Sequence, residues 1–179
     1  NNSIFAEQII KTLQNKNSSK YLDLLSNPLF LILFINSFES YPNIPPKKTQ
    51  FYWQVFDALF DKHETFSKGG YRRPKMSKLD RDSFELVLSS FCLASYFHNL
   101  FNFTELQFEE ILREISKNSE QKINISNFLE DLKVAIPIIV EDGNVLSFIH
   151  RSIQEYFAAM HLSKLKDEYN NNFLKNLEG

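Results

Sequence analysis

The sequence predicts a mainly α-helical protein in two parts, the second of which contains a single β-hairpin. Two compositional observations favour helices: the 179 residues include 18 phenylalanines and seven tyrosines, but only four glycines. Many large apolar residues with few glycines are typical of helices packed by aromatic side chains, because tight turns between strands often need glycine. The third observation is that only residues 137–149 have apolar, β-branched runs on both sides of a turn signal, Asp142-Gly143.

Helical periodicity defines the first part, a helical domain at residues 1–66. Its apolar residues recur at helical spacing in four segments, at 4–13, 20–25, 29–38 and 49–66. Asn27 and Pro28 begin the third segment, since asparagine caps helix N-termini and proline is favoured at the first helical position. That segment is apolar on nearly every side, which predicts a buried helix.

A basic stretch with two glycines, residues 67–78, is predicted to be a linker to the second part. Three helices are expected after it, at 80–100, 104–116 and 124–134. Thr104 and Gln107 have the spacing of a capping box at the start of the second of these. The hairpin and an amphipathic helix come next. Three helices, a hairpin and a helix are the order of a winged-helix domain with the hairpin as its wing, which we assign to 79–165, with 166–179 beginning a following helical segment.

Composition and charge exclude several classes of protein. The net charge is −2, so the chain as a whole has no bulk attraction for nucleic acid or anionic membrane. Cys92 is the single cysteine, which excludes an internal disulfide and fits a reducing, cytoplasmic setting. The most apolar run, 29–35, is far shorter than the roughly 20 residues that span a bilayer. The chain begins without methionine or signal peptide and ends in the opening of a helix, so we expect a piece of a longer protein.

Enzyme signatures are absent from the sequence. It contains no G-x-x-x-x-G-K-[ST] phosphate loop, no H-E-x-x-H and no G-x-S-x-G. The four histidines lack the i, i+3 or i+4 spacing of metal ligands: His63, His98, His150 and His161. We therefore expect neither a catalytic residue nor a metal site in this chain.

The stretch from Phe148 to Ala159, F-I-H-R-S-I-Q-E-Y-F-A-A, carries the strongest functional signal. It places His150 where the hairpin ends and the last helix begins. A helix N-terminus gathers unpaired N–H groups and the positive end of the helix dipole, so it favours an anion such as phosphate. The imidazole Nε2–H can donate to a phosphate oxygen. A histidine whose bonds are satisfied locally is the competing interpretation.

Gln154 and Glu155 follow in the same stretch. Helical spacing puts both on the side away from the apolar face formed by Ile153, Tyr156 and Phe157. They are expected either in solvent or in a contact between domains, and the sequence does not distinguish the two.

This pattern resembles the end of the winged-helix domain in NACHT-type STAND NTPases, the signalling ATPases that include NOD-like receptors and many bacterial defence proteins. The segment from Leu24 to Leu33, with its Asn-Pro-Leu, is similar to a segment of the small helical domain that follows the ATPase core in that family. The resemblance implies that His150 reaches a phosphate of bound ADP. It also implies that Pro28, with Asn27 beside it, lies against the adenine.

The resemblance covers roughly residues 20–165 and implies a regulatory function. The chain would be a nucleotide-sensing lid of a signalling ATPase in innate immunity or anti-phage defence, which holds the ADP-bound off state and moves on ATP-driven activation. ADP or ATP would bind the intact protein but not this chain alone, because the phosphate loop is missing. Its implied partners are the ATPase core of its own chain and like protomers that oligomerise on activation.

A winged-helix regulator that binds nucleic acid is the alternative, and a purely structural helical interaction domain is a third possibility. Basic residues cluster around the linker: Lys68, Arg72, Arg73, Lys75, Lys78 and Arg81. However, the helix that would read DNA carries Glu130 and Asp131 against a single Lys133. Such a helix needs several Arg, Lys, Asn or Gln side chains on its exposed face, so nucleic acid is disfavoured.

Overall fold

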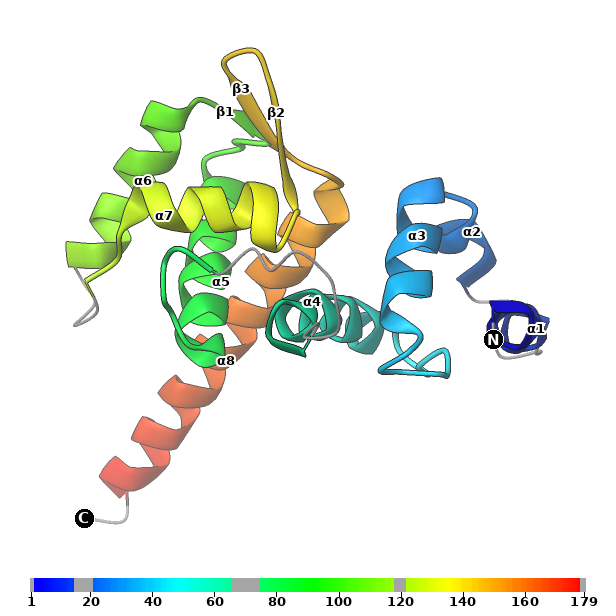
Figure 1. Cartoon of the computed structure of the whole chain (residues 1–179). Helices are drawn as coiled ribbons and strands as arrows, with labels where there is room; N and C mark the ends of the chain where they lie inside the picture. Colours follow the sequence, from blue (N-terminus) through cyan, green and yellow to red (C-terminus); the bar gives the residue numbers. More distant parts are fainter. Residues whose placement is uncertain (1, 15–20, 66–74, 118–121, 178–179) are drawn as a thin grey trace. The chain divides into compact units, whose positions relative to one another are not determined.

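The computed structural model describes residues 2–14, 21–65, 75–117 and 122–177. The chain is mainly helical with a small antiparallel sheet of three strands (Figure 1). It divides into two compact units, Asn1–Arg72 and Arg73–Gly179, each of which is described by itself. The division falls within the stretch 67–78, of which 67–74 lies outside the described residues.

Helices make up the described part of the first unit. These are α1 (Asn2–Leu13), α2 (Leu22–Leu25), α3 (Pro28–Ser37) and α4 (Lys48–Thr65). Helix α3 begins where the sequence predicts. The Asn27 side chain accepts a hydrogen bond from the Leu29 N–H at 2.9 Å, and Pro28 occupies the first helical position.

Aromatic side chains from α3 and α4 form the core of the first unit. Phe34 lies with its ring centroid 5.4 Å from that of Phe38, and both are nearly fully buried with Phe51 of α4. The prediction that α3 is buried all round is wrong, because Ile32 is 56% exposed. Helices α2 and α4 pack against α3 but leave this residue in solvent.

The second unit follows the order helix, strand, helix, helix, hairpin, helix. Its elements are α5 (Arg81–Phe97), β1 (Asn102–Phe103), α6 (Glu105–Lys117), α7 (Ile125–Glu130), a π-helical turn (Asp131–Ala135), β2 (Ile139–Asp142), β3 (Val145–Phe148) and α8 (Arg151–Leu177). Helix α7 and the π-helical turn together occupy the single helix predicted at 124–134. Helix α8 continues unbroken past residue 166, where the sequence predicts a new segment, because no Gly or Pro interrupts it.

Side-chain caps set where the helices of the second unit begin. The predicted capping box forms at α6: the Thr104 N–H donates to Gln107 Oε1 at 2.9 Å, and the Gln107 N–H donates to Thr104 Oγ1 at 3.3 Å. Asp80 caps α5 by accepting from the backbone and hydroxyl of Ser83, and these bonds lower the pKa of the Asp80 carboxyl. Asn124 caps α7 through its side chain.

The sheet has the strand order β1-β3-β2, and β2 and β3 form the predicted hairpin. Asp142 pairs with Val145, so the two-residue turn is Gly143-Asn144, one position later than predicted. Gly143 has a φ of 60°, a left-handed conformation that glycine adopts without a steric penalty. The sequence does not predict β1, because its two residues, Asn102–Phe103, are too few to show a period.

Phe91 of α5 lies at the centre of the second core. Its ring centroid is 4.6 Å from that of Phe108 in α6, 5.3 Å from that of Phe103 in β1 and 6.2 Å from that of Phe148 in β3. One side chain therefore contacts a helix and two of the three strands. Phe91 has no solvent exposure.

Helix α8 lies antiparallel along α5. Side-chain hydrogen bonds along the seam establish the direction: Gln154 with Ser95, His161 with Ser89 and Lys164 with Glu85. Cys92 of α5 is fully buried, and this burial raises the pKa of its thiol well above the usual value. The single cysteine is therefore held as the protonated thiol, in a structural position.

We predict that Phe91→Ala lowers the free energy of unfolding by about 3–5 kcal/mol, because loss of the ring leaves an apolar cavity that the surrounding side chains fill only in part. Phe97→Ala, on the same helix but at a site that is 69% exposed, is the matched control. It should change the free energy of unfolding by no more than about 0.5 kcal/mol. Urea unfolding followed by circular dichroism measures both, and equal losses would contradict the described core.

Candidate functional site

His150 is the residue between β3 and α8, and it caps the N-terminus of α8. Its backbone carbonyl accepts a hydrogen bond from the Ile153 N–H at 3.0 Å. Its Nδ1 accepts from the Ser152 N–H at 3.1 Å, and the Ser152 hydroxyl lies 2.7 Å from the same nitrogen. The half-buried imidazole therefore acts as the N-cap side chain of α8, at a position usually occupied by Ser, Thr, Asp or Asn.

These contacts decide which ring nitrogen of His150 carries the proton in the neutral imidazole. The backbone N–H of Ser152 can only donate, so Nδ1 must accept. The proton of the neutral ring is then on Nε2, which makes Nε2–H the donor. A histidine that contacts a phosphate oxygen without becoming charged needs this tautomer.

Arg151 is the cation adjacent to His150, and its guanidinium group contacts two nearby side chains. Its guanidinium carbon lies 3.9 Å from the ring centroid of Phe101, a cation–π arrangement. Its Nε is 2.9 Å from a carboxylate oxygen of Glu155, one turn along α8. Because Glu155 offsets this charge, the first turn of α8 offers an anion the helix N-terminus and the histidine, and little net charge beyond them.

Gln154 lies where the sequence does not predict it, since it is fully buried rather than on the outer side of α8. Its Nε2 donates to the Ser95 hydroxyl at 2.8 Å and to the Leu100 carbonyl at 3.0 Å. Its Oε1 has no hydrogen-bond partner among the described residues. Glu155 is exposed and forms its ion pair with Arg151.

The bonds of Gln154 fix the position of His150, which precedes it by about one helical turn. Ser95 is near the end of α5, and Leu100 lies between α5 and β1. Asn99, beside Leu100, has a φ of 55°, so the chain turns sharply there. One amide thus joins the first turns of α8 to the end of α5 and to the turn that leads into the sheet.

Asn27 and Pro28, the other predicted site residues, belong to the first unit. The Asn27 carboxamide oxygen is engaged as the cap of α3, through its bond to the Leu29 N–H. Pro28 is exposed at the first position of that helix. The structure therefore makes Asn27 a capping residue and leaves the Pro28 ring as the apolar surface at this helix end. His150 belongs to the second unit.

The outward face of α7, the surface that the nucleic-acid alternative requires, differs from the prediction. Asp131 is only 1% exposed, so it is not part of the exposed helix face. Asn127 uses its side-chain N–H to bond the Met76 carbonyl at 3.0 Å. The Lys133 ammonium lies 2.9 Å from a Glu141 carboxylate oxygen, and this hydrogen bond raises the pKa of Lys133.

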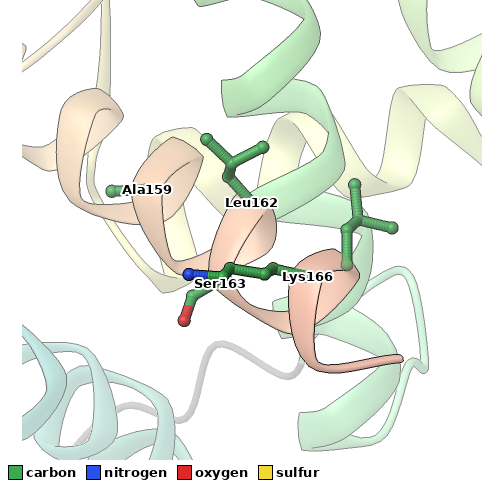
Figure 2. A pocket seen from close by; sticks show the side chains of 5 residues that line it. Ala159, Leu162, Ser163 and Lys166 are labelled. Carbon is green, nitrogen blue, oxygen red and sulfur yellow. The ribbon is translucent and has the colours of Figure 1, made fainter. Parts of the chain in front are cut away.

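One face of α8 lines an open hollow of about 630 Å³ (Figure 2). The described residues that line it are Ala159, Leu162, Ser163, Leu165 and Lys166. Its walls are mainly apolar and include one hydroxyl and one ammonium group. Ala159 is about 13 Å along the helix axis from His150, at 1.5 Å per residue. The hollow is therefore separate from the candidate site.

Comparisons with known proteins identify no relative: no family model matches the chain, and a search of curated proteins finds no match. Within the described ranges, no three His, Cys, Asp or Glu side chains are grouped so that they could hold a metal ion. No helix in the same part of the chain is long and apolar enough to cross a bilayer.

We predict that Gln154→Ala lowers the free energy of unfolding by about 2–3 kcal/mol, since it leaves the partly buried Leu100 carbonyl without its donor and removes buried atoms. Glu155→Ala changes the neighbouring, exposed residue and removes only an i, i+4 ion pair, worth at most about 0.5 kcal/mol. Urea unfolding of the two variants compares them directly. A Gln154→Ala loss as small as that of Glu155→Ala would show that the buried amide does not hold α8.

Proposed function

We propose that this chain is the helical and winged-helix regulatory region of a NACHT-type STAND ATPase, in which it acts as a lid over bound ADP. The observation that carries the proposal is the geometry of His150 within the F-I-H-R-S-I-Q-E-Y-F-A-A stretch. Nδ1 is used by Ser152, and Nε2–H is the donor. An N–H donor at a helix N-terminus is suited to a phosphate oxygen.

The element order of the second unit supports the winged-helix assignment. Three helices with a short strand between the first two, followed by a hairpin, match that arrangement, with β2 and β3 as the wing. The strand order β1-β3-β2 puts the short strand against the second strand of the hairpin. His150 then lies directly after the wing, at the base of α8.

The donor set fits one edge of a phosphate group and no more. His150 supplies one N–H, and the first turn of α8 supplies its dipole, while the Arg151 charge is offset by Glu155. Bound ADP would bring a polyanion that this single donor recognises. The ATPase core of the same chain would supply the phosphate loop, and with it most of the affinity.

The lid works through a difference in affinity between two arrangements. A contact between His150 and the phosphate that forms only in the closed arrangement stabilises that arrangement when ADP is bound. Breaking the contact favours the open arrangement, in which like protomers associate. We place this activity in the cytoplasm, in immune or anti-phage signalling, where the buried Cys92 thiol stays reduced.

Nucleic-acid binding by the same unit has less support. The Asn127 amide and the Lys133 ammonium, two polar groups that α7 and its π-helical turn could offer to DNA, bond to Met76 and Glu141. Contacts between basic side chains and phosphates dominate DNA affinity, and this chain has a net charge of −2. Duplex DNA should therefore bind no more tightly than the non-specific range of about 10⁻⁴ to 10⁻⁶ M. A gel shift that shows sequence-selective, salt-resistant binding would favour this function instead.

We predict that His150→Ala in the intact protein removes a charge-assisted hydrogen bond of roughly 1.5–3 kcal/mol to ADP. ADP should then bind about tenfold to a hundredfold more weakly. The off state should lose a similar free energy, so the variant should signal without its trigger. Isothermal titration with ADP and a signalling assay at rest measure the two effects.

His98→Ala is the matched control, because His98 is an exposed histidine at the other end of α5 from the capping Asp80. It should leave ADP affinity and resting activity unchanged. Unchanged values in His150→Ala as well would show that His150 is only a helix cap. The upstream sequence offers a separate test, since a phosphate loop is expected about 150–250 residues before Asn1, a distance scaled from the size of a domain.

A further inference from the structure

A single buried carboxylate holds the segment that leads into α5. Asp131, the first residue of the π-helical turn, accepts hydrogen bonds from the Met76 N–H at 2.6 Å and from the Ser77 N–H at 2.9 Å. Asn127, about one turn earlier, donates its side-chain N–H to the Met76 carbonyl at 3.0 Å. These bonds attach one short stretch of backbone to the outward face of α7.

The chemistry of this contact requires an aspartate. Each of the two backbone N–H groups has its own carboxylate oxygen, Oδ1 for Met76 and Oδ2 for Ser77. Charge-assisted bonds of this kind are about twice as strong as neutral ones, and they offset the cost of burying the Asp131 charge. Asparagine has the same shape but would turn an N–H₂ donor toward one of the two N–H groups.

Two side chains of the segment add little to its attachment. The Met76 side chain is 50% exposed, so it adds little to the core. Lys78 has a φ of 57°, a left-handed conformation that is unfavourable for a residue with a side chain. Asp80, at the end of the segment, bonds within its own helix start through Ser83. None of the bonds from Asp131 and Asn127 to the segment involves a side chain of the aromatic core around Phe91.

We propose that residues 75–79 form a strap that Asp131 holds closed over α7, and that the strap opens while the helical body of the second unit stays folded. Opening uncovers the Asn127 amide and the Asp131 carboxylate. The strap needs no nucleotide. This proposal therefore goes beyond the function proposed above, and its test does not depend on that function.

Amide hydrogen exchange on the isolated chain, followed by NMR, tests the strap. In Asp131→Asn the Met76 and Ser77 amides should exchange about tenfold to a hundredfold faster than in the unmodified chain. The Leu88 amide in the middle of α5 should keep its protection. Glu130→Gln makes the same chemical change on the adjacent residue, whose carboxylate is 3.8 Å from the Lys133 ammonium. It should leave the Met76 and Ser77 amides unchanged.

Asn127→Ala is a second, milder variant that removes only the bond to the Met76 carbonyl. It should accelerate exchange of the same two amides by about threefold to tenfold, as expected for a neutral hydrogen bond. Unchanged exchange at Met76 and Ser77 in Asp131→Asn would overturn the proposal, as would an equal acceleration in Glu130→Gln. Loss of protection at Leu88 in step with the strap would also overturn it, because the strap would then open only with the body.

Discussion

The antiparallel packing of α8 along α5 is the constraint on which the second unit depends. Phe91 joins one side of α5 to α6, β1 and β3, and the other side receives α8. Gln154 selects the register of this seam, because only one placement of α8 gives its buried amide both the Ser95 hydroxyl and the Leu100 carbonyl. A shift by one helical turn would bury an unsatisfied amide and carbonyl, which cost about 1–3 kcal/mol each. The start of α8, and with it His150, is thereby fixed relative to the sheet.

Features that depend on neighbouring residues could be predicted from the sequence. The cap formed by Asn27, the capping box at Thr104 and the hairpin at 139–148 each involve groups within about ten residues of each other, where local chemistry decides. Features that depend on distant partners could not. Asp131 bonds to a residue 55 positions away, and Gln154 to one 54 positions away. Helical spacing put Asp131 on an exposed helix face and Gln154 on the side away from the apolar face, because spacing does not show which element covers that side of the helix.

The same distinction holds at the candidate site. The sequence places His150 at the junction of hairpin and helix, and the structure agrees. The role of Ser152 in fixing the ring tautomer was not predicted, because it requires the direction of the backbone N–H. A contact of His150 or Pro28 with nucleotide stays a prediction. The strap ends just before Asp80, the residue that caps α5, and α8 packs along the same helix.

The most direct test of the central claim is a structure of the intact protein with ADP. The account predicts that Nε2 of His150 lies about 3 Å from a phosphate oxygen, a hydrogen-bond distance, while Nδ1 keeps its bond to the Ser152 N–H. Bound ADP whose phosphates contact only the ATPase core, with His150 bonded to protein groups alone, would contradict it.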